Sequence, residues 1–106
     1  MSTYSCIDIN DALPLLENNA IVVDIRDAVS FQTSHMNAAI NLNNDNVQAF
    51  IEESNKSQAV IVCCYHGNSS KGAAEFLASQ GFEEVYSLNG GFSQWSAMFP
   101  EQCEQG

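Results

Sequence analysis

Two short runs of apolar, mostly β-branched residues place the strongest constraint on how this chain can fold. Residues 20–25 read AIVVDI, and residues 59–63 read AVIVC. Nearly continuous apolar runs of this kind are typical of strands that are buried on both faces. Such strands need helices above and below them, so the two runs predict a parallel sheet at the centre of an α/β protein.

Patterns for helices and further strands lie between and around these two runs. The spacing predicts strands at residues 5–9, 39–42 and 84–88, and helices from residue 10 or 11 to about 18 and over 27–34, 46–53, 70–80 and 91–98. Asn10 or Asp11 is the expected cap of the first helix, Pro14 is expected near its first turn, and Gly81 is expected to end the helix over 70–80. Strands that alternate with helices predict βα units and a parallel sheet covered on both faces.

One domain is expected to fill residues 1–106, because the chain has the size of a single hydrophobic core and shows no internal repeat or linker. It contains no run of about 18 apolar residues, so no membrane-spanning helix is expected. The first ten residues, MSTYSCIDIN, have neither a basic patch nor an apolar stretch, so no secretory signal is expected. We therefore expect a cytoplasmic protein that does not associate with membranes.

Charge and cysteine usage narrow the classes of function. The chain has 13 acidic and 3 basic residues, a formal net charge of −10, which argues against nucleic acid and acidic membrane surfaces as partners. The cysteines show no C-x-x-C spacing and the two histidines lie far apart in the sequence, so no metal site is predicted. Without a secretory signal, we expect reduced thiols at Cys6, Cys63, Cys64 and Cys103.

A short polar loop follows the second buried run and leads into a helix. It reads CYHGNSS from Cys64 to Ser70. Backbone N–H groups in such a strand-to-helix loop converge on one spot, and the helix N-terminus adds about half a positive charge. Gly67 lets the backbone curl, and Asn68 tolerates left-handed angles. The loop therefore predicts an anion-binding nest made by the backbone, which Lys71 can reinforce.

The thiol of Cys64 is expected to ionise easily in this nest. Helix N-termini can lower a cysteine pKa by one to several units from about 8.5. The alternative interpretation is a buried cysteine at a strand end that packs as a small hydrophobe. The arrangement of strand, cysteine, polar loop and helix favours a nucleophile over that alternative.

Two chemistries use a thiolate beside an anion cradle. Phosphoryl transfer through a cysteinyl phosphate needs the pattern C-x5-R, because the arginine clamps the phosphate with two hydrogen bonds. Ser70 occupies that sixth position, and no arginine follows Arg26. Sulfur transfer needs only attack of the thiolate on the outer sulfur of a donor such as thiosulfate, with sulfite leaving. Sulfur transfer therefore fits the residues better.

Three segments carry a resemblance to a known family. They are VVDIRDAVSFQTSHMNAAINL (22–42), CYHGNSSKGAA (64–74) and NGGFSQW (89–95). In these segments the chain resembles the single-domain rhodaneses, and most closely the GlpE-type thiosulfate sulfurtransferases. The first is similar to the family's first signature, the second to its active loop and the third to its C-terminal signature. The first signature departs from the family at Ser34, where glycine is usual, and at Asn37-Ala38, where Pro-Gly is usual.

The resemblance implies a five-stranded parallel sheet flanked by helices and a cytoplasmic enzyme. It also implies a persulfide intermediate on Cys64 and binding of the thiosulfate donor by the loop, with acceptors such as cyanide, thiols or dithiol proteins, thioredoxin among them. No cofactor is implied. The residues expected to bind substrate are Tyr65, His66, Gly67, Asn68, Ser69, Ser70 and Lys71.

Other polar residues have structural interpretations. Arg26 could orient substrate, but a structural ion pair with Asp24 or Asp27 is favoured. We expect His35 to hydrogen-bond to backbone. His66 could act as a general base, but sulfur transfer needs none, so we expect it to shape the loop.

The remaining expectations concern packing. Cys63 should point to the opposite face of its strand from Cys64 and pack there. Phe92 and Trp95 should belong to the core. The acidic tail from Glu101 should be a solvated end, and Cys6 and Cys103 lie near the termini without an expected role.

Two classes of function remain open for this chain. One is an enzyme that turns over thiosulfate. The other is a sulfur-carrier module in which Cys64 holds a persulfide for a docked protein. Steady turnover with a small-molecule donor and acceptor distinguishes them, and phosphatase activity is a distant third.

Overall fold

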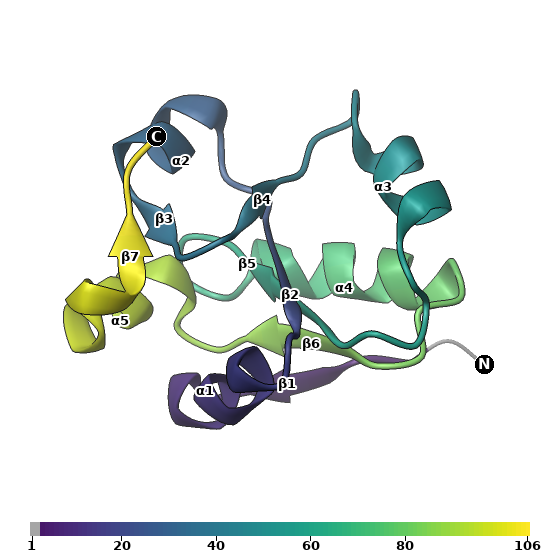
Figure 1. Ribbon diagram of the computed structural model, residues 1–106, viewed down its shortest axis with the longest axis horizontal. Coiled ribbons are helices and arrows are strands. Elements are labelled where there is room, and N and C mark those ends of the chain that lie inside the picture. Colours follow the sequence, from purple (N-terminus) through teal and green to yellow (C-terminus); the bar gives the residue numbers. More distant parts are fainter. Residues whose placement is uncertain (1–2) are drawn as a thin grey trace.

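The computed structural model describes residues 3–106 and is built on one parallel sheet. The sheet has five strands in the order β1-β6-β5-β2-β4, and every neighbouring pair in it is parallel. Figure 1 shows helices on both sides of this sheet. In chain order the elements are β1 (Ser5–Ile7), α1 (Ile9–Glu17), β2 (Ile21–Asp24), α2 (Ala28–Thr33), β3 (His35–Met36), β4 (Ile40–Asn41), α3 (Val47–Glu53), β5 (Val60–Cys63), α4 (Ser69–Ser79), β6 (Val85–Leu88), α5 (Gly91–Met98), a 3₁₀ turn (Pro100–Gln102) and β7 (Cys103–Glu104).

Alternate residues of the central strand β5 face two separate cores. Val60 and Val62 pack with residues of α3 and α4, whereas Ile61 and Cys63 pack with residues of α1 and α5. All four side chains are fully buried. The predicted five-stranded parallel sheet with helices on both faces is confirmed, and its cause is this two-sided burial.

The N-terminal helix differs from the sequence-based prediction. Helix α1 begins at Ile9, after an N-cap at Asp8 whose side chain makes no capping hydrogen bond, so neither Asn10 nor Asp11 is the cap. Pro14 lies in the interior of the helix and not in its first turn. It costs one intrahelical hydrogen bond, and the burial of Ile9 and Ala12 against the sheet holds the helix nevertheless.

A second, two-stranded sheet joins the middle of the chain to its C-terminal end. His35–Met36 (β3) pairs antiparallel with Cys103–Glu104 (β7), and Figure 1 shows β7 lying beside β3. The tail from Glu101 is mostly exposed, as expected for a solvated end, but this pairing orders Cys103 and Glu104 as a strand. Pairs of two residues leave no periodic signal in the sequence, so only the approach of the two segments in space reveals this sheet.

The departures from the first rhodanese signature lie on both sides of β3: Ser34 directly precedes this strand, and Asn37 and Ala38 directly follow it. Ala38 stands where the family usually has glycine, and it keeps a left-handed backbone with φ of +63°. An L-residue other than glycine, asparagine or aspartate rarely adopts this conformation. The turn therefore keeps the left-handed backbone conformation typical of glycine, although this conformation is less favourable for Ala38.

A buried ion pair holds the loop after β2. Asp24 ends the strand and is fully buried, and its carboxylate accepts hydrogen bonds from the Arg26 side chain at 2.8–3.1 Å and from the Arg26 backbone at 3.0 Å. The Arg26 guanidinium also donates to the Ser34 carbonyl at 2.7 Å and lies 4.1 Å from the centre of the Phe92 ring. One cation therefore ties together the ends of β2, α2 and the start of α5.

No helix within residues 3–106 combines the length and the apolar character needed to cross a membrane.

Replacing Asp24 with alanine should destabilise the protein strongly, because it leaves the Arg26 charge buried without its partner. We expect the free energy of unfolding to fall by about 3–5 kcal/mol. Urea unfolding followed by fluorescence of the buried Trp95 measures this. The exposed Asp45→Ala is the matched control and should change stability by less than about 0.5 kcal/mol. Equal effects of the two variants would show that the ion pair is dispensable.

Candidate active site

Cys64 directly follows β5, at the carboxyl end of the middle strand of the sheet. Its side chain is buried, and its Sγ accepts hydrogen bonds from the backbone N–H of Gly67 at 3.1 Å and of Ser70 at 3.3 Å. The loop therefore curls around the sulfur and points N–H groups at it, as the strand-to-helix spacing predicts. Ligand sites in open parallel sheets occupy this edge.

Gly67 makes the curl of the loop possible. Its φ is +93°, and a Cβ at this position would lie 2.9 Å from the Gly90 nitrogen and 3.0 Å from the Leu88 carbonyl oxygen. Asn68, for which a left-handed conformation was considered, is right-handed with φ of −90° and forms the N-cap of α4. The loop needs one left-handed residue and uses the glycine for it.

The first turn of α5 holds the loop in place through two backbone hydrogen bonds. The Phe92 N–H donates to the Cys64 carbonyl at 2.8 Å, and the Ser93 N–H donates to the Tyr65 carbonyl at 3.0 Å. Gly91 has φ of +58°, and a Cβ there would lie 2.5 Å from the Cys64 carbonyl oxygen. With these two carbonyls bound to α5, the N–H groups that follow are left free to face the sulfur. For this segment only a family signature and core packing of Phe92 and Trp95 were predicted, so its contact with the site was missed.

Hydrogen bonds lower the pKa of the Cys64 thiol below its ordinary value. Burial alone would raise this pKa, but donation from the Ser70 hydroxyl and from the backbone N–H groups of Ser70, Gly67 and His66 outweighs it. The stabilising groups are neutral dipoles, so the site can hold an anion inside a protein with a net charge of −10.

The predicted site residues fall into two groups, one buried and in contact with the thiol and the other exposed on the surface of the loop. Gly67 and Ser70 are buried and contact the thiol through their N–H groups. Five residues of the set are exposed: Tyr65, His66, Asn68, Ser69 and Lys71. Ser70 is fully buried, and its Oγ lies 2.7 Å from the Oγ of Ser87 on β6. Ser87 was missed, because a lone serine in a strand carries no motif.

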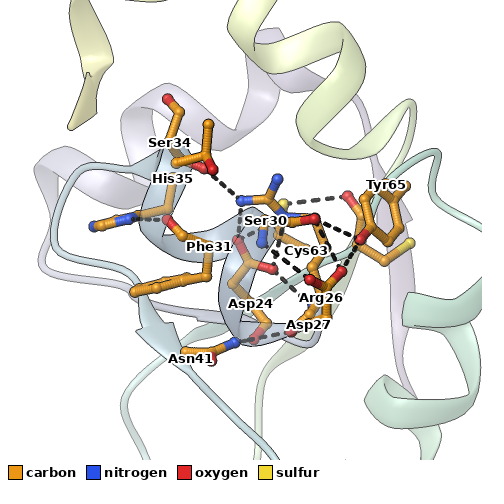
Figure 2. A network of polar contacts seen from close by, with 12 residues as sticks. Asp24, Arg26, Asp27, Ser30, Phe31, Ser34, His35, Asn41, Cys63 and Tyr65 are labelled. Carbon is orange, nitrogen blue, oxygen red and sulfur yellow. Dashed lines mark hydrogen bonds and ion pairs between the residues drawn. The ribbon is translucent and has the colours of Figure 1, made fainter. Parts of the chain in front are cut away.

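Tyr65 connects the loop to the start of α2. Its hydroxyl donates to the Asp27 carboxylate and lies 2.8 Å from the Ser30 hydroxyl, as Figure 2 shows. Asp27 also caps α2 through the Ser30 N–H at 3.0 Å. The hydrogen bond from Tyr65, followed by those from Ser30, lowers the pKa of Asp27 to about 2. The carboxylate therefore remains an ionised acceptor for Tyr65 at neutral pH.

Arg26 and His35 make the contacts of structural residues. Arg26 is held by the buried Asp24, and both lie in the network of Figure 2. The Nδ1 of His35 lies 2.7 Å from the Phe31 carbonyl oxygen, and its ring stacks on the Phe31 ring with centroids 3.8 Å apart. Its Nε2 lies 3.3 Å from the Glu104 carboxylate on β7. These contacts agree with the structural interpretation of both residues.

The other cysteines lie away from the loop chemistry. Cys63 is buried in the core beside α1 and α5, and burial raises its thiol pKa. Cys103 lies on β7, where burial raises its pKa as well. Cys6 is exposed on the edge strand β1. Within residues 3–106, no three His, Cys, Asp or Glu side chains are grouped so as to hold a metal ion.

A cleft of about 720 Å³ opens beside the site, between the loops after β2 and β4 and the helices α3 and α4. Its walls include Ile25, Asp27, Val47 and Phe76. No residue from Cys64 to Lys71 lines this cleft, so the cleft does not include the loop around the thiol. The N–H groups that face the thiol belong to the loop from Cys64 to Ser70 and not to this cleft.

Comparison with known proteins agrees with this geometry. The family described as "Rhodanese-like domain" matches residues 9–98. A curated relative, the thiosulfate sulfurtransferase GlpE of Ectopseudomonas mendocina (strain ymp), is 47% identical over 106 residues, which is 100% of this chain and 97% of the relative. The chain belongs to the rhodanese-like family.

Solved structures show the same fold. The rhodanese-like domain of an Anabaena protein has a TM-score of 0.81 at 25% identity, covering 95% of this chain and 79% of that one. A rhodanese-related protein from Thermoplasma volcanium has a TM-score of 0.76 at 24% identity, covering 90% and 93%. The reduced CoADR-RHD protein of Bacillus anthracis has a TM-score of 0.79 at 20% identity, and this chain spans 94% of its own length and 18% of that longer chain.

Replacing Gly91 with alanine should disturb the loop, because the new Cβ would meet the Cys64 carbonyl and φ is left-handed. We expect a loss of at least about 2 kcal/mol in the free energy of unfolding. Gly72→Ala on α4 is the matched control: no atom lies within 4 Å of its added Cβ. It should stabilise the helix by about 0.5–1 kcal/mol. Urea unfolding measures both, and a neutral Gly91→Ala would contradict the close contact.

The lowered pKa of Cys64 should be visible in its reactivity. A thiol whose pKa is lowered in the folded state ionises at lower pH, so alkylation of Cys64 by iodoacetamide should reach half its maximal rate at a lower pH than alkylation of Cys103. The linked stability should be present above the unfolded-state pKa and decline as the pH falls through the folded-state pKa. Peptide mass spectrometry resolves the sites, and a Cys64 midpoint at or above that of Cys103 would refute the expectation.

Proposed function

We propose that this protein is a thiosulfate sulfurtransferase that works through a persulfide on Cys64. One observation carries the proposal: a buried thiol of lowered pKa lies inside a ring of N–H donors at the end of the central strand. Identity of 47% with a thiosulfate sulfurtransferase over the whole chain supports the same chemistry. Thiosulfate is the proposed donor.

In the first half of the reaction, the Cys64 thiolate attacks the outer sulfur of thiosulfate. A new S–S bond forms to Cys64 while the S–S bond of thiosulfate breaks, and its electron pair leaves with sulfite. Sulfite is a stable anion, so no general acid has to protonate it. Cys64 then carries a persulfide, whose negative charge the loop N–H groups and the start of α4 stabilise.

In the second half, a nucleophile takes the outer sulfur and returns Cys64 to the thiolate. Cyanide yields thiocyanate. A thiol acceptor becomes a persulfide, and in a dithiol protein such as thioredoxin the second thiol attacks that persulfide, forming a disulfide and releasing sulfide. The atoms balance without a cofactor, and the enzyme alternates between two covalent forms.

The exposed loop residues form the mouth through which donor and acceptor reach the sulfur. The exposed residues are Tyr65, His66, Asn68 and Ser69, with Tyr65 held by Asp27. Lys71 lies in the first turn of α4 and is the cation placed to attract a dianion there. We assign these residues to substrate binding, together with Gly67 and Ser70.

Two other functions fit the residues less well. Phosphatase chemistry lacks its arginine, because the buried Ser70 occupies the position where the clamp would stand. A persulfide carrier for a docked protein would use the same Cys64 chemistry but would show no steady turnover with cyanide. We place the reaction in the cytoplasm, in keeping with four free thiols, and take residues 1–106 to act as one domain.

Treatment with thiosulfate alone should add one sulfur atom, about 32 mass units, to the intact protein. Cyanide should then restore the original mass. Cys64→Ser should show neither change and no thiosulfate:cyanide turnover, because a hydroxyl hardly ionises and is a poor sulfur nucleophile. Cys63→Ala, which removes the neighbouring buried thiol, should keep the mass change and most of the turnover.

Steady-state kinetics complete this test. A double displacement predicts parallel double-reciprocal lines for thiosulfate and cyanide. Intersecting lines without a mass gain would show direct transfer in a ternary complex and would remove Cys64 from its proposed role. A mass gain without turnover would favour the carrier module.

A further inference from the structure

Tyr65 directly follows Cys64 and is held at both its backbone and its hydroxyl. Its carbonyl accepts a hydrogen bond from the Ser93 N–H of α5 at 3.0 Å. Its hydroxyl donates to the Asp27 carboxylate, which when ionised can only accept, and lies 2.8 Å from the Ser30 hydroxyl of α2 (Figure 2). The residue is 45% exposed. These contacts, and not burial, therefore fix its position at the surface of the loop.

Asp27 is itself held in place. It caps α2, accepting hydrogen bonds from the Ser30 N–H at 3.0 Å and from the Ser30 hydroxyl at 2.9 Å. The residue before it, Arg26, is bound through its backbone and its side chain to the buried Asp24 at the end of β2. The hydrogen bond from Tyr65 to Asp27 is therefore a tether that joins the loop to a fixed acceptor.

The backbone on either side of the Tyr65 Cα is bound to α5. The Cys64 carbonyl accepts from the Phe92 N–H at 2.8 Å, and the Tyr65 carbonyl accepts from the Ser93 N–H. The carbonyl and the N–H of one trans peptide point in opposite directions, and no cis peptide occurs within residues 3–106. The N–H groups of Tyr65 and His66 thus point away from α5. Only the two backbone torsions of Tyr65 connect these two peptide planes, so holding its side chain opposes their rotation.

We propose that Asp27 is a positioning residue for Cys64: by binding the Tyr65 hydroxyl, it fixes the backbone of the loop directly after the nucleophile. The inference rests on the proposed function, in which Cys64 reacts with a bound anion. Without the tether, the loop N–H groups take more orientations, and binding of an anion has to order them at a cost in free energy. The tether should therefore favour the binding of thiosulfate and leave the reaction of bound thiosulfate nearly unchanged.

The charge of Asp27 acts in the opposite direction to the tether. A carboxylate beside the loop repels a dianion, so by charge alone its removal should lower the Michaelis constant (KM) for thiosulfate. Loss of the tether should raise KM. Asp27→Ala removes both the charge and the acceptor. Asp27→Asn removes the charge but keeps an amide oxygen that can accept from Tyr65 and cap α2.

Steady-state kinetics of thiosulfate:cyanide transfer test the proposal. Tyr65→Phe, which leaves the cap of α2 intact, should raise KM for thiosulfate by about three- to tenfold, the effect of one lost hydrogen bond, and change kcat by less than about twofold. Asp27→Ala should also raise KM, whereas Asp27→Asn should leave it at or below the wild-type value. Tyr86→Phe is the matched control: it removes a hydrogen bond of 2.6 Å from a tyrosine hydroxyl to the Glu84 carboxylate, and should change neither constant.

A double-mutant cycle separates the tether from a direct contact between the hydroxyl and the donor. Adding Tyr65→Phe to Asp27→Ala should have no further effect, because the hydroxyl acts only through Asp27. An unchanged or lower KM in Tyr65→Phe or Asp27→Ala overturns the proposal, and so does a Tyr65→Phe effect that persists in full in the Asp27→Ala background. If Asp27→Ala does not fold, Tyr65→Phe alone decides the outcome.

Hydrogen exchange followed by mass spectrometry needs no turnover, so it tests the tether independently of the reaction. Exchange of the amides of residues 65–70 should become at least about threefold faster in Tyr65→Phe and stay unchanged in Tyr86→Phe. Absence of a persulfide in the wild-type protein would refute the proposed function, while the exchange rates would still decide whether the tether orders the loop. Conversely, normal persulfide formation in wild type with unchanged exchange in Tyr65→Phe would leave the function intact and remove Asp27 from it.

Discussion

The central strand β5 is the constraint on which the rest of this protein depends. Parallel neighbours bond to it on both sides, and its four side chains are fully buried between two layers of helices. Such a strand can end only at the edge of the sheet, where the chain must turn sharply into the next helix. Cys64 lies at that turn, and the backbone that continues into α4 encloses its sulfur. The position of the thiol is therefore a consequence of the burial of the strand.

The anion site that we propose lies in an acidic protein, and its attraction for an anion is local. Two of the three basic residues are engaged elsewhere: Arg26 with the buried Asp24, and Lys56 with the Ile51 carbonyl and the face of Phe82. Lys71 lies in the first turn of α4 after the loop, and the guanidinium of Arg26, although bound to Asp24, lies 5.7 Å from the centre of the Tyr65 ring. The N–H groups of the loop supply the attraction instead, and α5 keeps them available by binding the Cys64 and Tyr65 carbonyls. The surplus of negative charge is thus no obstacle at the thiol.

Much of this could be predicted from sequence because it depends on neighbours along the chain. The buried runs predict the sheet, and helix α5 was predicted with its observed bounds. Cys64 followed by a short polar loop and a helix predicts the N–H nest. Three features could not be predicted in this way. The pairing of β3 with β7, the support of the loop by Gly91 and the contact of Ser70 with Ser87 each join residues far apart in sequence.

By itself, the sequence determined the order along the chain of the five helices and of the five strands of the parallel sheet, the burial of β5 and the place of a thiol at a helix N-terminus, since local patterns of apolar, polar and glycine residues specify each of them. The tertiary structure alone decided what surrounds that thiol. Whether Gly91 has room for a side chain, where the Ser70 hydroxyl points and which carboxylate holds Tyr65 depend on how β6, α5 and α2 approach the loop. Side-chain packing across the sheet determines how these elements lie against the loop, and no local sequence pattern specifies that packing.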